Sequence, residues 1–303
     1  MSKMKILYYI RSVLIHQYTS NIYSIMIQFN SLSFSYSPKL KLFEQLDFSI
    51  KPGMIHGLLG KNGSGKTTML KLICGLVKPF AGEVLTGNYV PSKRQPQFLS
   101  DVYLLTEEVY LPASSADKLV KLYAPFYPRF DSSQFRDFLQ QFDVDFLQPL
   151  TKLSLGQKKK VMIAFALACN TSYLLLDEPT NGLDIPSKLV FRRLIASVFS
   201  EERTIVISTH QVRDLDSLID NVILLHANKV QVQSSIEQIA ANYQFIHSAV
   251  QPEGEILYSC RSVLGQSYII TNPQNKAGQV DIETFFNAVT EDSGRFQFSE
   301  KLN

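Results

Sequence analysis

The sequence predicts an α/β fold built around a parallel sheet, and two segments carry this prediction. The first is a short apolar run, Met54 to Leu59, followed by a glycine-rich loop and by a helix expected over Lys66 to Leu76. The second is another apolar run, Tyr173 to Leu176, which ends in two carboxylates. Buried parallel strands are continuous apolar runs of this length, and α/β folds bind their ligands beyond the carboxyl ends of the strands.

The glycine-rich loop has the spacing G-x-x-x-x-G-K-[ST], which is typical of nucleoside triphosphate binding. Its glycines allow backbone N–H groups to point inward at phosphate oxygens, and the following helix adds the positive end of its dipole. Lys66 is expected to reach the β- and γ-phosphates, and the Thr67 hydroxyl to ligate Mg²⁺. A glycine-rich turn without phosphate is the alternative, which the flanking strand and helix disfavour. The nucleotide contacts expected from the loop are Gly60, Lys61, Asn62, Gly63, Ser64, Gly65, Lys66, Thr67 and Thr68.

The two carboxylates that end the second apolar run are Asp177 and Glu178. Asp177 suits a Mg²⁺ ion held through water, because Mg²⁺ keeps several waters and takes few carboxylates. Glu178, one residue further, is expected to orient or deprotonate the water that attacks the γ-phosphate. Two solvated acids at the end of a strand are a common alternative, but the phosphate loop upstream favours the catalytic interpretation.

A third pattern, Leu153-Ser154-Leu155-Gly156-Gln157, precedes the second apolar run and begins an apolar helix. Asn181 to Asp184 follow the two carboxylates, His210 follows another apolar run, and Tyr36 lies upstream of the phosphate loop. In their order and spacing these segments resemble the ATP-binding cassette (ABC) family over about Met26 to Val230. The pattern at Leu153 is similar to the signature sequence of that family.

The resemblance implies a role for each of these residues. Two copies of the chain form a head-to-tail dimer, in which the signature of one copy covers the ATP held by the other. The signature is suited to this contact because a capped helix N-terminus binds anions. Tyr36 stacks on adenine, His210 contacts the γ-phosphate and positions the water, and Asp184 lies at the dimer interface and connects the two active sites. The signature residues expected to contact the partner's ATP are Ser154, Leu155, Gly156 and Gln157.

Two positions depart from the family pattern. Leu155 stands where glycine is usual, which leaves Ser154 and Gly156 for the phosphate contact. Glu107, in the segment after Val102 to Leu105, stands where the family has a glutamine near the metal and the water. A glutamate can accept a hydrogen bond from water or coordinate Mg²⁺, but it cannot donate when ionised. Glu107 is therefore expected among the catalytic residues together with Glu178 and His210.

The composition is that of a globular protein from a reducing compartment. The chain has 303 residues, of which 45% are hydrophobic, and a net charge of +3, which does not indicate a nucleic acid partner. Its three cysteines imply neither a disulfide framework nor a zinc site. Lys158, Lys159 and Lys160 are expected on a solvated helix face, with phosphate or lipid contact as the alternative.

No segment has the roughly eighteen uninterrupted apolar residues of a membrane span. We therefore expect a cytoplasmic protein, peripheral on the inner face of the cell membrane. Residues 1–25 contain an apolar run that Arg11 interrupts, so a signal peptide is not predicted there. They are expected to be an extension, with Met26 as the alternative start of translation.

The remaining elements follow in order along an ABC ATPase domain of residues 26–230. An antiparallel β subdomain is expected over 27–56 and 83–85, a helical signature subdomain over 108–152, and a helix over 187–199. Two more buried strands are expected, at 204–208 and at 221–225, the latter as the last strand of the core. A small C-terminal α+β extension, 231–303, is expected to contain helices at 234–243 and 281–289 and a hairpin around Gly265. The predicted fold is thus an α/β phosphate-loop NTPase core with a mixed sheet, an antiparallel β subdomain, a helical signature subdomain and this extension.

The function predicted from these residues is that of an ATP-binding and hydrolysing subunit of an ABC transporter, of the single-cassette export type. The membrane path belongs to a separate permease, whose helix is expected near Glu107 and Tyr110 to Pro112. A second nucleotide-binding domain, as a homodimer, is the other expected partner. The alternative is a soluble ABC ATPase of translation or repair, although no long coiled coil lies between Thr68 and Leu153.

Overall fold

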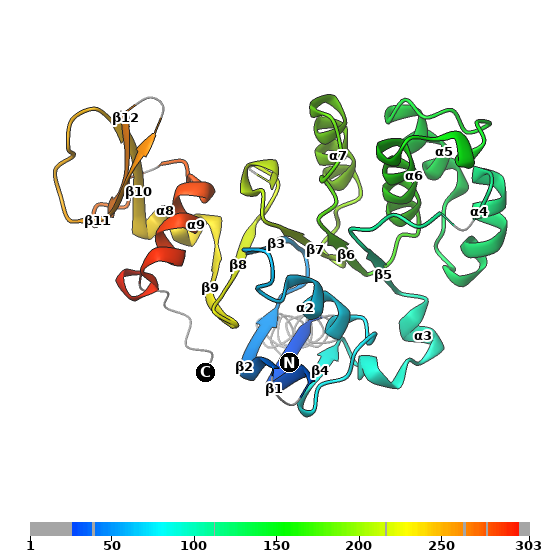
Figure 1. Ribbon diagram of the computed structural model, residues 1–303, viewed down its shortest axis with the longest axis horizontal. Coiled ribbons are helices and arrows are strands. Elements are labelled where there is room, and N and C mark those ends of the chain that lie inside the picture. The colour runs from blue at the N-terminus through cyan, green and yellow to red at the C-terminus, as the bar shows by residue number, and fades with distance from the viewer. Residues whose placement is uncertain are drawn as a thin grey trace, which may run out of the picture.

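A six-stranded sheet forms the centre of the protein, as the computed structural model in Figure 1 shows. The structure describes residues 26–37, 40–111, 113–215, 217–262, 265–276 and 278–296; the expected extension at 1–25 lies outside them. The strand order is β5-β6-β7-β3-β8-β9, with parallel neighbours up to β8 and an antiparallel β9. The strands are β3 (Met54–Gly60), β5 (Val102–Leu105), β6 (Tyr173–Asp177), β7 (Thr204–Thr209), β8 (Asn221–His226) and β9 (Lys229–Ser235).

Side chains of the central strands alternate between two apolar cores. Leu174 and Leu176 of β6 lie in one core, whereas Tyr173 and Leu175 lie in the other. This follows from the period of two in a strand, since successive side chains point to opposite faces of the sheet. A strand that is buried on both faces is apolar at every position, which is why these runs were recognisable in the sequence.

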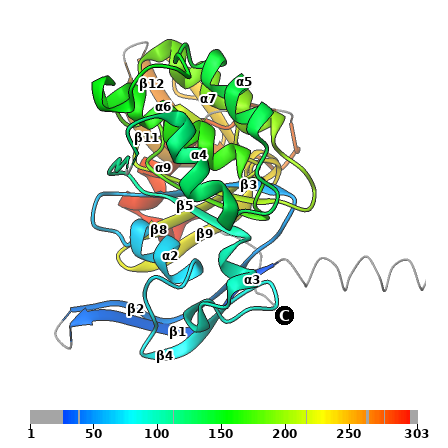
Figure 2. The same ribbon diagram turned by 90° about the vertical axis from the view of Figure 1, so that its right-hand side faces the viewer.

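One face of the central sheet is covered by α2 (Lys66–Ile73) and by a second sheet of order β2-β1-β4. In Figure 2 this antiparallel sheet lies below the central one, with α2 between them. Its strands are β1 (Ile27–Ser37), β2 (Leu40–Ile50) and β4 (Ala81–Thr86). The predicted antiparallel subdomain is confirmed, although its third strand is longer than expected.

The other face is covered by helices of the predicted helical subdomain and by α7 (Ile185–Ser197). Four aromatic rings, from Tyr103, Phe130, Phe135 and Tyr127, surround Phe165 of α6 (Leu155–Ala168), the longest of the described helices. Helices α4 (Ala116–Tyr123) and α5 (Ser132–Gln141) lie on the same face as α6, with 3₁₀ turns η2 (Ala124–Phe126) and η3 (Leu150–Lys152). Helix α3 (Pro96–Leu99) and the 3₁₀ turn η1 (Pro91–Lys93) lie on the first face, where Phe98 is buried in the core around α2 and η1 contacts α2 and β4.

The strand Asn221–His226 is not the last strand of the core, which corrects the expectation above. Ala227 and Asn228 both have positive φ, 48° and 64°, as a two-residue hairpin turn requires, and β9 then returns antiparallel beside β8. The turn was missed because it has no glycine. β9 also runs across the expected domain boundary at Val230.

Beyond β9 a third sheet, of order β10-β12-β11, packs with two helices. The hairpin around Gly265 and both helices are confirmed, whereas β10 was not predicted. Helix α9 lies against η4 (Val212–Leu215), where Arg213 pairs with Glu283. The elements here are α8 (Ile236–Asn242), β10 (Tyr243–Ser248), β11 (Ile256–Ser262), β12 (Gly265–Thr271), α9 (Ile282–Glu291) and η5 (Ser293–Arg295).

Candidate functional site

The phosphate loop connects β3 to α2 at the carboxyl edge of the central sheet. Gly65 ends it with a φ of 103°, a conformation that favours glycine, and a Cβ there would lie 2.7 Å from Phe43. Lys66 is buried, and its Nζ donates to the carbonyl oxygen of Gly60 at 2.8 Å. The Ser64 hydroxyl is buried without a hydrogen-bond partner among the described residues. A buried unpaired hydroxyl in a loop of this kind is suited to donate to a phosphate oxygen.

Asp177 lies directly across from Thr67. The Thr67 hydroxyl donates to Asp177 Oδ2 at 2.7 Å, and the Ser208 hydroxyl donates to Asp177 Oδ1. Three elements, α2, β6 and β7, therefore bring one carboxylate and two hydroxyls together at one point. Carboxylate and hydroxyl oxygens are the hard ligands that Mg²⁺ prefers, so the Thr67 and Asp177 oxygens fit the metal role predicted for them.

The Glu178 carboxylate is buried beside the side chains of Lys66 and His210. Its Oε1 lies 2.8 Å from His210 Nδ1 and 3.4 Å from Lys66 Nζ. Its Oε2 is buried without a hydrogen-bond partner among the residues that the structure describes. The sheet thus brings together three predicted site residues from positions 66, 178 and 210, because β3, β6 and β7 are close neighbours.

Lys159 corrects the expectation of a solvated lysine face. Its side chain is buried, with 4% of the residue exposed, and Nζ donates to the carbonyl oxygen of Glu178 at 2.6 Å. Burial lowers the pKa of Lys159, while the carboxylates of Glu107, Glu178 and Asp177 act in the opposite direction. Its neighbours in the lysine run are only half-buried.

The spacing along α6 does not by itself identify which lysine of the run is buried. Lys159, Ile163 and Ala166 follow the spacing i, i+4 and i+7, so they share one face of α6. Ile163 and Ala166 are fully buried. Lys160 is followed at the same spacing by the fully buried Ala164 and Leu167, because α6 is apolar on all sides beyond the lysine run, and yet Lys160 is only half-buried.

Glu107 follows β5 and faces the segment after the catalytic strand. Its Oε1 accepts a hydrogen bond from Asn181 Nδ2 at 3.0 Å. Asn181 comes three residues after Glu178. Glu107, which departs from the family pattern, therefore lies close to the segment that carries Glu178. Its catalytic role stays a prediction.

The signature residues form the N-terminus of α6. The Ser154 hydroxyl accepts from the Gln157 N–H at 3.2 Å, and Gln157 Oε1 accepts from the Ser154 N–H at 3.0 Å, a reciprocal capping box. Leu155 is 70% exposed. A Cβ on Gly156 would lie 3.1 Å from the carbonyl oxygen of Gly182, so the signature packs directly against the loop that leads to Asp184.

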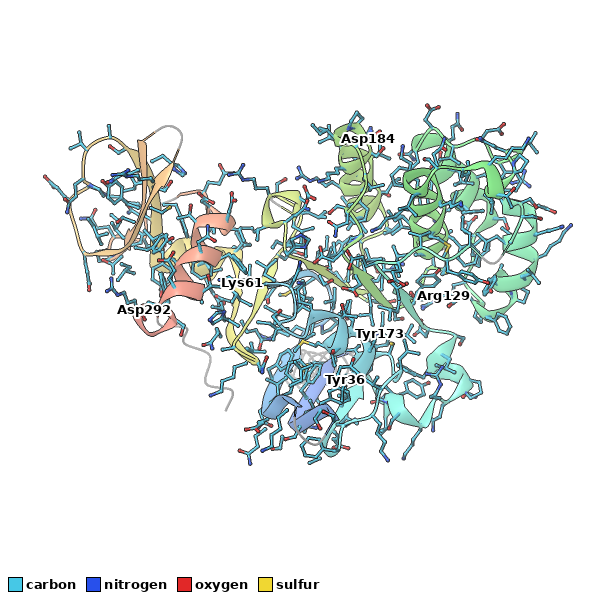
Figure 3. The ribbon with its side chains drawn as sticks, in the orientation of Figure 1. Tyr36, Lys61, Arg129, Tyr173, Asp184 and Asp292 are labelled. Atoms are coloured by element: carbon cyan, nitrogen blue, oxygen red, sulfur yellow. The ribbon has the colours of Figure 1, made fainter. Side chains whose placement is uncertain are left out.

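Asp184 and Tyr36 lie in different parts of the molecule, as Figure 3 shows. Asp184 caps α7 and accepts from the Ser187 N–H at 2.9 Å; these hydrogen bonds from Ser187 hold the pKa of the exposed Asp184 carboxyl below its usual value. Tyr36, one residue before the end of β1, is 57% exposed, and its hydroxyl lies 3.1 Å from Thr68 Oγ1 of α2. Its contact with adenine stays a prediction.

Comparison with known proteins places the chain in a family. The family described as ABC transporter matches residues 43–181. An ABC transporter ATP-binding protein of Caldanaerobacter subterraneus subsp. tengcongensis is 30% identical over 234 residues, which cover 71% of this chain and 93% of that protein. The chain belongs to the ABC transporter ATP-binding proteins. The predicted family is therefore confirmed, and the protein is an ATPase subunit that powers a membrane transporter.

Further relatives agree with this family. The bacitracin transport ATP-binding protein BcrA of Bacillus licheniformis is 31% identical over 195 residues, 63% of each chain. A solved ATP-binding subunit of an ABC transporter superposes with a TM-score of 0.64 over 71% of this chain and 91% of that one, at 23% identity, and supports the predicted fold. None of the described helices combines the length and apolar character that crossing a bilayer requires.

Proposed function

We propose that two copies of this chain bind two ATP molecules with Mg²⁺ in a head-to-tail dimer, whose closing and opening drive a separate permease at the inner face of the cell membrane. The observation that carries this proposal is the meeting of Lys66, Glu178 and His210 beside the Thr67–Asp177 pair. One cation for phosphate, one carboxylate for water and one pair of hard oxygen ligands are the parts that phosphoryl transfer to water requires.

In this proposal Lys66 leaves Gly60 and Glu178 to pair with the β- and γ-phosphates. The Glu178 carboxylate, released from Lys66, accepts a hydrogen bond from the attacking water and takes up its proton. Mg²⁺, held by Thr67 and through water by Asp177, supplies charge neutralisation on the phosphates when bound. His210 Nδ1 donates to the Glu178 carboxylate. In a neutral imidazole ring Nε2 is then an acceptor. His210 can therefore donate to the γ-phosphate only if the ring is protonated or if it rotates so that its N–H faces the phosphate.

Exposed apolar side chains support the dimer. Leu155 at the start of α6 and Ile185 and Leu189 on α7 are 70%, 77% and 53% exposed. They flank the contact between Gly156 and the loop that leads to Asp184. Burial of such side chains against a second copy would favour association, while Ser154 and the free N–H groups of α6 supply the contacts for the partner's γ-phosphate.

An exposed aromatic side chain supports the permease contact. Tyr110, three residues after Glu107, is 79% exposed, and Leu111 beside it packs against the core. The third residue of the expected docking segment, Pro112, lies outside the described residues. An amphipathic helix of a permease that contacted Tyr110 would act on the segment that also carries Glu107.

The variant Glu178→Gln tests the proposal, because it keeps the shape of the side chain and removes its charge. We expect hydrolysis to fall by about two or more orders of magnitude, the scale of removing a positioned base, while ATP binding persists. Light scattering after size-exclusion chromatography should then show a dimer with Mg-ATP and a monomer with Mg-ADP. A variant that stays monomeric with Mg-ATP, both alone and with the co-expressed permease, contradicts the head-to-tail arrangement.

A further inference from the structure

The backbone at Glu178 adopts a conformation that its own sequence does not favour. Its φ is +46°, in the left-handed region, which non-glycine residues seldom occupy, and the next residue is Pro179, which restricts the residue before it. Such conformations persist only where surrounding contacts hold them. The position of the Glu178 carboxylate beside Lys66 and His210 therefore depends on what holds this peptide.

Contacts from both sides hold it. The Glu178 N–H donates to the carbonyl oxygen of Ser208 at 3.1 Å and lies 3.2 Å from its hydroxyl. The Glu178 carbonyl oxygen accepts from Lys159 Nζ at 2.6 Å and from the Asn181 N–H at 3.3 Å. A charged donor at this distance is the strongest of these hydrogen bonds. Lys159 is thus the main contact on the carbonyl side of the peptide.

The charges around Lys159 agree with this assignment. Burial disfavours its ammonium form, and the nearby carboxylates of Glu107, Glu178 and Asp177 favour it. Lys66, which pairs with the Glu178 carboxylate, is a second buried ammonium of the site. The three carboxylates oppose the effect of burial on Lys159, and its bond to the Glu178 carbonyl oxygen gives the ammonium group an acceptor.

Lys159 also belongs to the helix that begins with the signature. It lies five residues after Ser154, about 7.5 Å along α6 at the usual rise of 1.5 Å per residue. A displacement of the α6 N-terminus is therefore carried directly to the Glu178 carbonyl, because a helix is stiff over one to two turns. The Lys159 side chain joins the helix that carries the signature to the catalytic peptide.

We propose that Lys159 is a positioning residue that fixes the catalytic Glu178 through its backbone and connects it to the signature helix of the same chain. This inference rests on the proposed head-to-tail dimer, in which the signature contacts the ATP held by the partner. Contact with the partner's γ-phosphate then sets the orientation of the glutamate that acts on the chain's own ATP. Each chain thereby connects the two nucleotide sites in one direction, through α6 and Lys159.

The test compares Lys159→Met, which keeps the length of the side chain and removes its charge, with Lys159→Arg and with Lys158→Met as the matched control on the half-buried neighbour. We expect kcat for ATP hydrolysis to fall about tenfold or more in Lys159→Met, the effect of a misplaced base, with KM for ATP within about twofold of the parent. Lys159→Arg should recover part of the loss, and Lys158→Met should match the parent. An unchanged kcat, or a rise in KM that accounts for the whole loss, overturns the inference.

A second measurement separates positioning from folding and from the dimer itself. In the Glu178→Gln background, Lys159→Met should still form the Mg-ATP dimer, but hydrogen exchange in residues 173–184 should no longer be slowed by ATP, while protection of residues 60–68 is kept. If residues 173–184 exchange faster in Lys159→Met than in the Glu178→Gln background already without ATP, or if the dimer is lost, Lys159 has a purely structural role and the inference is overturned. If Glu178→Gln alone fails to dimerise, the proposed function fails; if it dimerises and Lys159→Met hydrolyses ATP at the parent rate, only this inference fails.

Discussion

At the scale of single residues, several side chains of the site are hydrogen-bonded or ion-paired to groups within it. Lys66 bonds to the Gly60 carbonyl and pairs with Glu178, and Thr67 bonds to Asp177. In the proposed function, the β- and γ-phosphates of ATP would pair with Lys66, and Mg²⁺ with Thr67 and Asp177, so these groups would exchange partners when nucleotide binds.

Lys66→Ala tests the phosphate contact at this scale. A hydrogen bond to a charged group contributes about 1.5–3 kcal/mol, so we expect ATP affinity to fall by about ten- to a hundredfold. Calorimetric titration in the Glu178→Gln background, where hydrolysis does not interfere, measures the change. Lys61→Ala, on an exposed lysine of the same loop, is the comparison and should lose less. Equal affinity in Lys66→Ala and the parent would refute the assignment of Lys66 to the phosphates.

At the scale of elements, the strands and helices around the motifs were predictable because their patterns are local. The apolar run of β6, the glycines before α2 and the capping residues of α6 each specify an element without reference to the rest of the chain. Lys159 and β9 were not predicted, for different physical reasons. The burial of Lys159 depends on which face of α6 meets the sheet, and β9 depends on a turn formed by Ala227 and Asn228 without glycine.

Helix α5 offers a test of an element's stability that leaves the site untouched. Asp131 caps it, and Oδ1 accepts from the N–H groups of Ser133 at 2.7 Å and Gln134 at 3.0 Å. Asp131→Ala should lower stability by about 1 kcal/mol, because two N–H groups of the first turn lose their acceptor. Thermal unfolding measures this as a lower Tm, with ATP hydrolysis at low temperature unchanged. Asp137→Ala on the exposed face of α5 is the matched control, and an equal fall in both variants would rule out a capping effect.

At the scale of the whole molecule, a buried histidine in the central sheet makes the stability of the protein depend on pH. His56 in β3 is buried, and its Nε2 lies 2.8 Å from the Lys51 carbonyl oxygen. Burial lowers the pKa of His56, and the contacts with Lys51, Asn221 and Asp220 oppose that effect without reversing it. The unfolded chain therefore binds a proton at this histidine more readily than the folded protein does.

The sign of the pH effect follows from this difference. Above the unfolded pKa of about 6.5 the histidine is neutral in both states and its contribution is fully present; as the pH falls below 6.5 it is lost, by at most about 1.4 kcal/mol per pH unit. We expect Tm to fall as the pH is lowered from 6.5 to 5 and this fall to be smaller in His56→Gln. The same pH dependence in His56→Gln and the parent would contradict the assignment.

The contact between α9 and η4 affects where the chain can be shortened. Val212 and Leu215 of η4 are buried in one continuous apolar core with Phe285 and Val289 of α9. A shortened protein that stops after β9 would lack the side chains of α9 that pack with these two residues of η4, only a few positions downstream of His210. We therefore expect a recombinant cassette that retains α9 to unfold at a higher temperature than one that ends after β9.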